Sequence, residues 1–123
     1  MITYETGNPH FGGRTFIQLA NNGDVLVEQK QGDQTRRFSG KVNPAVHRGI
    51  LMHFKEAHRS AVGLSEDKPV PGETLVTLHA VTAVENIDLS FWSNQRWSQP
   101  ALDRLISDFE RLASTASGGV VRF

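Results

Sequence analysis

The segment RTFIQLANNGDVLVEQK, residues 14–30, constrains the fold of this chain more than any other segment. Two runs of alternating apolar and polar residues flank the tripeptide NNG. Such alternation is typical of a β-strand buried on one side, and Asn-Gly supplies the positive φ angles of a tight hairpin turn. A second turn signal, Gly32-Asp33, follows. The pattern therefore predicts a meander of three strands, at about residues 14–20, 24–30 and 34–39.

Further strands are predicted before and well after this meander. MITYE at the N-terminus alternates Ile2 and Tyr4 with polar residues, and a loop rich in Gly, Asn and Pro follows. The segments TLVTLHAV and VENIDLSFW also alternate. Their apolar parity predicts that six side chains face the core, namely Val76, Leu78, Ala80, Ile87, Leu89 and Phe91.

The hydrophobic period changes to that of a helix at two places. After Asn43-Pro44, apolar residues recur at steps of three and four, with Asn43 as N-cap and Pro44 in the first turn. A second apolar stripe follows Pro100, with Ser98 or Gln99 as the cap. We expect the small, glycine-rich residues from about 116 to 123 to form a flexible tail.

The length of 123 residues predicts a single domain spanning residues 1–123. The predicted order is β-β-β-β-α-β-β-α. We expect an α+β fold with an antiparallel sheet of about five to six strands and two amphipathic helices on one face. The other face of the sheet, here called the open face, would then meet solvent or a partner.

Composition narrows the classes of function. Lys plus Arg and Asp plus Glu both number 13, so the net charge is zero and no nucleic-acid partner is expected. The chain has no cysteine, which excludes disulfides and thiolate chemistry. The N-terminus has neither the basic nor the apolar region of a signal peptide, and no apolar run is long enough to span a membrane. We expect a cytoplasmic protein without membrane contact.

No catalytic, cofactor or metal site is predicted. Three of the five histidines, His47, His53 and His58, fall in the first helix. A helical metal pair needs spacings of three or four residues, whereas these are separated by six and five. Phosphate-binding loop and serine-nucleophile motifs are also missing. His79 and Asp88 would form a base and its orienter if the strand register brought them together.

The outward parity of the last two strands points to a binding surface. Leu75, Val81 and Trp92 would lie on the open face, with Leu26 added by the meander. Aromatic residues and Arg are enriched at interfaces. Trp97, beside Arg96, would either extend this surface or pack against the first turn of the second helix as a hydrophobic staple. The candidate partner-binding residues are Trp92, Trp97, Arg96, Leu75, Val81, His79 and Asp88.

Three segments together resemble the layout of small bacterial α+β inhibitor and immunity-type domains, including the emfourin-like protease inhibitors. These segments are GGRTFIQLANNGDVLVEQ, NPAVHRGILMHF and PALDRLISDFERL. The resemblance covers most of the chain as a pattern and contains no diagnostic motif. It implies a non-catalytic protein that binds and blocks another protein, and it assigns no functional residue.

We therefore expect a protein-binding domain of the inhibitor or immunity type. Two other interpretations stay open. One is a small enzyme or ligand-binding protein with a pocket near His79 and Asp88. The other is a homodimer in which two open faces cover each other. The Pro-containing loop at about residues 61–73 is either a functional or mobile segment or a connector that crosses one end of the sheet.

Overall fold

The computed structural model of the chain describes residues 1–8, 13–60, 75–97 and 99–119. Its elements follow the predicted order and give the predicted α+β fold. They are β1 (Ile2–Asn8), β2 (Gly13–Leu19), β3 (Asp24–Gln31), β4 (Gln34–Lys41), α1 (Pro44–Ser60), β5 (Leu75–Val81), β6 (Asn86–Trp92), the 3₁₀-helix η2 (Ser93–Trp97) and α2 (Pro100–Ser117).

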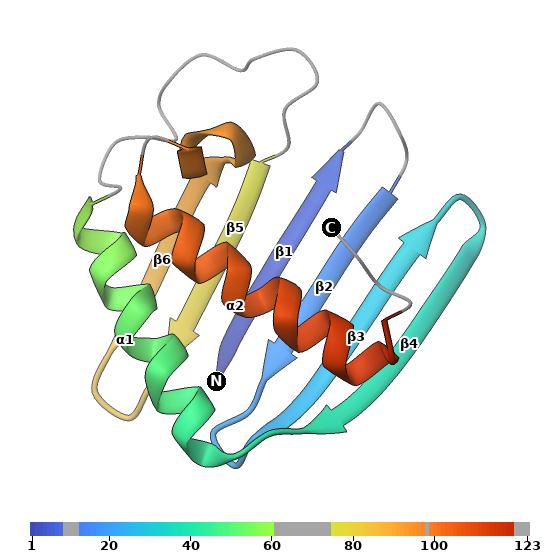
Figure 1. The fold of residues 1–123 in the computed structure, drawn as a ribbon, viewed down its shortest axis with the longest axis horizontal. Helices are drawn as coiled ribbons and strands as arrows, with labels where there is room; N and C mark the ends of the chain where they lie inside the picture. The colour runs from blue at the N-terminus through green and yellow to red at the C-terminus, as the bar shows by residue number, and fades with distance from the viewer. Residues whose placement is uncertain (9–12, 61–74, 98, 120–123) are drawn as a thin grey trace.

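The six strands form one antiparallel sheet in the order β4-β3-β2-β1-β5-β6 (Figure 1). The N-terminal strand β1 lies in the middle of the sheet, between β2 and β5. The hairpins β2–β3, β3–β4 and β5–β6 join strands that are neighbours in the sequence. Because β1 pairs with β5, it connects the N-terminal meander to the C-terminal hairpin.

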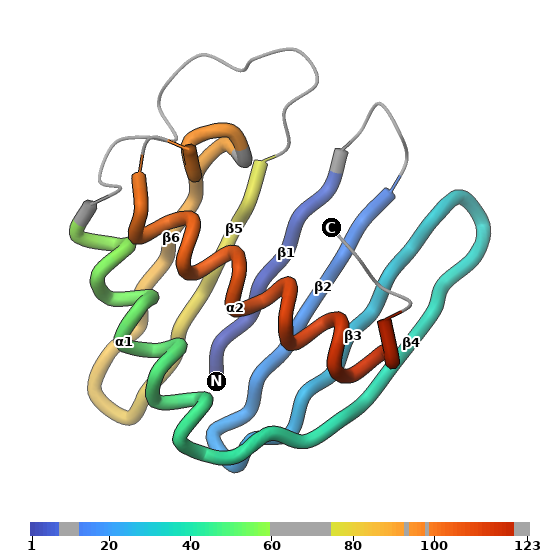
Figure 2. Tube along the Cα trace, viewed as in Figure 1, coloured from blue at the N-terminus to red at the C-terminus, as the bar shows by residue number. Residues whose placement is uncertain are grey.

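Both helices lie on the same face of the sheet (Figure 1). Helix α2 crosses the strands diagonally, and α1 lies beside it on the β6 side. The trace in Figure 2 shows that the link from β4 to α1 passes along one end of the sheet. This arrangement leaves the second face uncovered by any helix among the described residues.

The core lies between the sheet and the helices. Strand residues of one parity meet the apolar stripes of α1 and α2, as the alternation predicts. Phe54 and Phe109 are fully buried, and the ring of Phe109 stacks on that of Tyr4 with centroids 4.9 Å apart. Burial of this kind is the main favourable contribution to folding.

Of the predicted Asn22-Gly23 turn pair, only the glycine adopts a positive φ, whereas the predicted helix cap at Asn43 is confirmed. Gly23 has a φ of 94°, and a side chain there would collide with the carbonyl oxygen of Val42. Asn22 keeps a negative φ, and its side-chain oxygen instead accepts a hydrogen bond from the backbone N–H of Asp24 at 3.0 Å. At the start of α1, the Asn43 side chain accepts a bond from the N–H of Ala45 at 2.9 Å, which confirms the N-cap.

The prediction that a flexible tail begins at about residue 116 is wrong for residues 116 and 117. Helix α2 continues to Ser117 and ends at Gly118, whose φ is 63°. Ala116 lies against Gly40 of β4, and Ser117 is buried. Small residues let the helix approach the edge strand closely, so they extend the packing instead of ending it. Residues 120–123 and the predicted loop at 61–73 lie outside the described residues.

Candidate functional site

The open face is defined by one parity of all six strands. Strand register places its side chains in rows across the sheet. They are Thr3, Glu5, Gly7, Arg14, Phe16, Gln18, Asp24, Leu26, Glu28, Lys30, Thr35, Arg37, Ser39, Lys41, Leu75, Thr77, His79, Val81, Asn86, Asp88, Ser90 and Trp92. Among the candidate residues of the sequence, Trp92, Leu75, Val81, His79 and Asp88 share this face.

Trp92 and Leu75 form an apolar corner of the open face. They are directly opposite each other on β6 and β5. Leu75 is 39% exposed and Trp92 is half-buried. Directly opposed side chains of an antiparallel pair are in contact range, so this corner is one surface. Val81 lies at the other end of β5 and is 45% exposed.

The register also brings His79 and Asp88 together. They are opposite each other on β5 and β6, and His79 Nδ1 pairs with the carboxylate of Asp88. The Asp88 side chain is 76% exposed and that of His79 is 39% exposed. An exposed pair lacks the water-excluded cleft in which general base catalysis is effective. The geometry suits a polar contact at an interface better than a catalytic dyad.

Phe16 lies near the centre of the open face and was not among the residues predicted from the sequence. It is half-buried on β2, opposite Glu5 of β1 and Glu28 of β3. The alternation of Ile17 and Leu19 toward the core was the available signal, because it forces the adjacent Phe16 outward. The adjacency of two apolar residues, Phe16 and Ile17, hid it.

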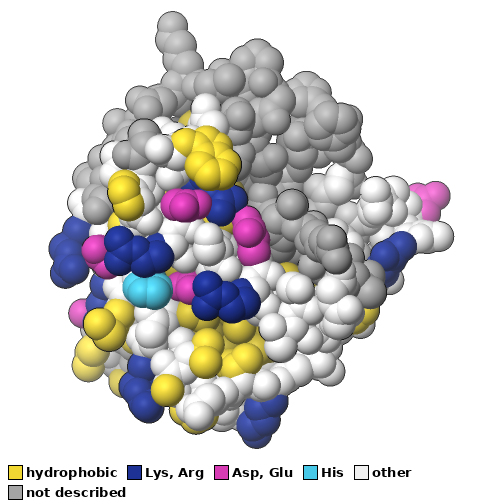
Figure 3. Space-filling model, in the orientation of Figure 1, with side chains coloured by type: hydrophobic (Ala, Val, Ile, Leu, Met, Phe, Trp, Pro, Cys, Tyr) yellow, Lys and Arg dark blue, Asp and Glu magenta, His cyan; other side chains and the backbone are white. Residues whose placement is uncertain are grey.

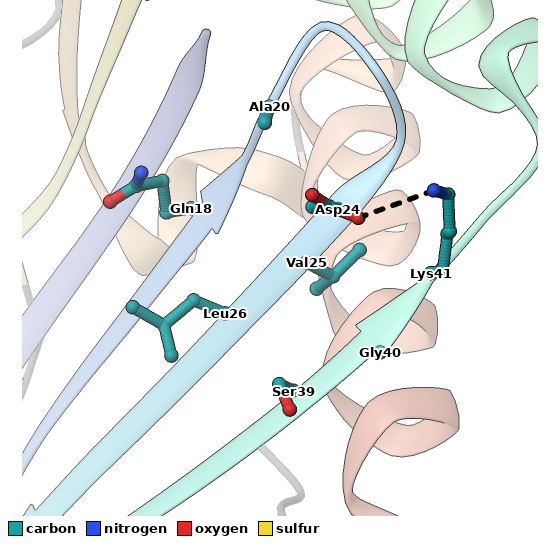
Figure 4. A pocket seen from close by; sticks show the side chains of 8 residues that line it. All are labelled: Gln18, Ala20, Asp24, Val25, Leu26, Ser39, Gly40 and Lys41. Carbon is teal, nitrogen blue, oxygen red and sulfur yellow. Dashed lines mark ion pairs between the residues drawn. The ribbon is translucent and has the colours of Figure 1, made fainter.

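Two shallow hollows lie on the β1–β4 half of this face. One, of about 440 Å³, surrounds Phe16 and is bordered by charged side chains of β1, β2 and β3. The other, of about 610 Å³, is drawn in Figure 4. There, Gln18, Leu26 and Ser39 extend from three neighbouring strands, with α2 behind the sheet. The short side chain of Ser39 leaves the space open beside Leu26.

Most charged side chains of the open face form ion pairs. Arg14 pairs with Glu5, and Arg37 donates to Glu28 at 3.1 Å. At the end of the β3–β4 ladder, Lys41 lies 3.7 Å from Asp24. These exposed pairs contribute little to stability. Their effect is to keep the face close to neutral, which differs from the basic surface that nucleic-acid binding requires.

Arg96 and Trp97 do not join this face. They belong to η2, which follows β6 and contacts α2. The Arg96 guanidinium donates to Asp103 at 2.7 Å and to Glu110 at 2.8 Å. Burial opposes the charge of Arg96, but hydrogen bonds to Glu110 and Asp103 outweigh it and raise its pKa. Arg96 is therefore held inside the molecule rather than offered to a partner.

Trp97 is 77% exposed, with the Arg96 guanidinium 4.8 Å from its ring centroid. The hydrophobic-staple alternative is wrong, because a stapling side chain would be packed against the helix. Trp97 instead forms an isolated aromatic contact point on the helix side. Figure 3, seen from that side, shows acidic and basic side chains next to each other across the helices.

Two general properties bear on the kind of site. Within the part of the chain that the structure describes, no group of three or more His, Asp or Glu residues is arranged to hold a metal ion. None of the helices in the described ranges has the length and apolar character needed to cross a membrane.

Comparison with protein-family models and with curated proteins finds no match for this chain. The resemblance to inhibitor and immunity-type domains therefore stays a prediction. The geometry of the open face is what carries a functional conclusion.

Proposed function

We propose that this protein is a non-catalytic binding domain whose open sheet face docks on another protein and blocks it, in the manner of an inhibitor or immunity-type protein. One observation carries the proposal. Five large apolar side chains stand on a sheet face that no described helix covers, namely Phe16, Leu26, Leu75, Val81 and Trp92. A plainly solvated antiparallel face alternates apolar residues inward and polar residues outward.

The remaining side chains of the face support a protein as the partner. Paired charges, an exposed His–Asp pair and a half-buried tryptophan match the mixed polar and aromatic composition of non-obligate protein interfaces. The hollows beside Phe16 and Leu26 would accept side chains that protrude from the partner. Apolar anchors that fill such hollows carry most of the binding energy of an interface.

Two alternatives differ in what the open face does. In a homodimer, the same five side chains would be covered by a second copy of the chain. In an enzyme or ligand-binding protein, His79 and Asp88 would act on a small molecule. The second alternative has less support, because the Asp88 carboxylate is largely surrounded by water. Replacement of His79 and Asp88 by alanine tests this alternative, and unchanged biological activity would contradict it.

The direct test is affinity capture from native lysate combined with site-specific photo-crosslinking. A photoreactive amino acid at Thr77, in the middle of β5 on the open face, should crosslink one dominant protein. The same amino acid at Met52, which is 71% exposed on α1, is the control and should not.

A pair of matched variants decides whether the open face is used. Leu75→Lys with Val81→Lys should reduce capture at least about tenfold, because it replaces exposed apolar contacts with charges. Met52→Lys with Val84→Lys changes two apolar residues that are more exposed and are not among the open-face side chains, and it should leave capture intact. Equal capture by both variants would contradict the proposal, and capture of only the same chain would indicate the homodimer.

A further inference from the structure

The two helices form a groove on the side of the molecule opposite to the open face. Two contacts join the helices. Arg104 Nη1 lies 3.5 Å from Glu56 Oε2, and His53 Nδ1 lies 2.5 Å from Asp108 Oδ2. Beyond these contacts the helices diverge toward the start of α1 and the end of α2 (Figure 1). A cavity of about 330 Å³ occupies the wedge between them.

The walls of the groove are mainly apolar. Helix α1 contributes Val46, Gly49, Ile50 and His53, which follow i, i+3, i+4 and i+7 spacing and so share one face. Helix α2 contributes a stripe of the same spacing, made up of Asp108, Arg111, Leu112 and Thr115. In Figure 3, hydrophobic side chains gather between the helices, with charged and histidine side chains along one border.

Gly49 keeps this groove open. A glycine inside a helix costs stability relative to alanine, so its presence needs a reason. A Cβ added at Gly49 would meet no atom within 4 Å, so close packing does not require the glycine. Gly49 lines the cavity, and because it has no side chain the space of the cavity stays free.

The narrow end of the groove is polar. His53 Nδ1 and the Asp108 carboxylate bind each other, and Asp108 is only 11% exposed. Arg111 lines the groove and has no ion pair among the described residues. The charge of Asp108 is thus already engaged, while the guanidinium of Arg111 is available to an anion.

We propose that the groove between α1 and α2 binds a small molecule that carries one carboxylate on an apolar body. The apolar body lies against Val46, Ile50 and Leu112, and the carboxylate accepts hydrogen bonds from Arg111. The cavity volume falls at the low end of the range for small-ligand sites and is too small for a helix of a partner. The groove is separate from the open face, so the proposed function does not depend on it.

The test uses 4-phenylbutyrate as the probe and 4-phenylbutanol as its uncharged counterpart. Binding is followed by amide NMR shifts on ¹⁵N-labelled protein. We expect shifts that concentrate at Gly49, His53 and Leu112, with at least roughly tenfold weaker binding of the alcohol because it lacks a charged hydrogen bond. Equal binding of both probes, or no shifts at these amides at millimolar probe, would overturn the proposal.

Two variants with matched controls locate the site. Gly49→Phe fills the cavity and should abolish the shifts, whereas Met52→Phe adds the same ring at an exposed position of α1 and should not. Arg111→Gln should weaken 4-phenylbutyrate but leave the alcohol unchanged, with Arg59→Gln as the control for lost charge. Thermal unfolding checks that each variant is folded. Unchanged binding by both Gly49→Phe and Arg111→Gln would show that the probe binds elsewhere.

Discussion

Arg96 is the residue that ties the chain between β6 and α2 to the helix. Its guanidinium donates to Asp103, Ser107 and Glu110, which lie on one face of α2, and its side chain is only 17% exposed. This half-buried guanidinium is stabilising mainly because its removal would leave Asp103 and Glu110 without their cation. The guanidinium carbon of Arg96 also lies 4.8 Å from the centroid of the Trp97 ring.

Replacement of Arg96 by methionine should destabilise the protein. Arg96→Met keeps the aliphatic bulk but leaves Asp103 and Glu110 without their cation, which we expect to cost about 1–3 kcal/mol of unfolding free energy. Urea denaturation measures it. Arg104→Met is the control. Arg104 and Glu56 form an exposed ion pair with a distance of 3.5 Å, so we expect a loss of unfolding free energy below about 1 kcal/mol. Equal costs for the two variants would argue against the role assigned to Arg96.

His47 should make the stability fall in mild acid. His47 is 8% exposed, and burial, with the nearby N-terminal ammonium and Arg48, lowers its pKa below 6.5. The unfolded chain therefore binds a proton more readily than the folded one. Stability from neutral His47 is complete above about pH 6.5 and is lost as the pH falls toward the folded-state pKa.

The measurement compares wild type with His47→Leu in urea denaturation between pH 8 and pH 5. The difference in unfolding free energy should be constant at the alkaline end. Below about pH 6.5 the wild type should lose stability relative to His47→Leu, because protonation of His47 favours the unfolded wild-type chain. A difference that does not change with pH would mean that His47 titrates alike in both states.

At the scale of elements, Gly49 makes helix α1 less stable than an alanine at the same position would. Gly49→Ala should raise the unfolding free energy by roughly 0.5–1 kcal/mol, because the helix gains propensity and the new methyl group meets no atom. Gly40→Ala is the contrasting change. There a Cβ would lie 3.4 Å from Ala116, so no comparable gain is expected. A loss of stability in Gly49→Ala would mean that the groove is closed in solution.

At the scale of the whole molecule, the two sides of the sheet differ in character. The helix side buries a continuous core, whereas the open face mixes apolar side chains with ion pairs. Stable homodimer interfaces are more apolar than a face that carries this many charged side chains. We therefore expect the purified protein to sediment as a 13.6 kDa monomer at micromolar concentration. A species of twice that mass, dissociated by Leu75→Lys with Val81→Lys, would favour the homodimer.

Local patterns in the sequence determined the elements and their orientation. Alternation decided which side chains of each strand face the core, since successive residues of a strand must point to opposite sides. Glycine at positive φ and Asn43 as N-cap decided where turns and α1 begin, because these effects act over a few residues. The outward positions of Leu75, Val81 and Trp92 followed from the same rule.

Only the tertiary structure decided which elements meet. His79 faces Asp88 because of strand register, and Phe16 lies between two glutamates because β1 enters the middle of the sheet. The groove depends on His53 and Asp108, which are 55 residues apart in the sequence. Contacts between residues so far apart in the sequence depend on how whole helices and strands pack. Local periodicity and capping residues do not predict that packing. This is why the sequence predicted the open face but not the groove behind it. The outward position of Phe16 did follow from local alternation, whereas its central place in the face depends on the strand order.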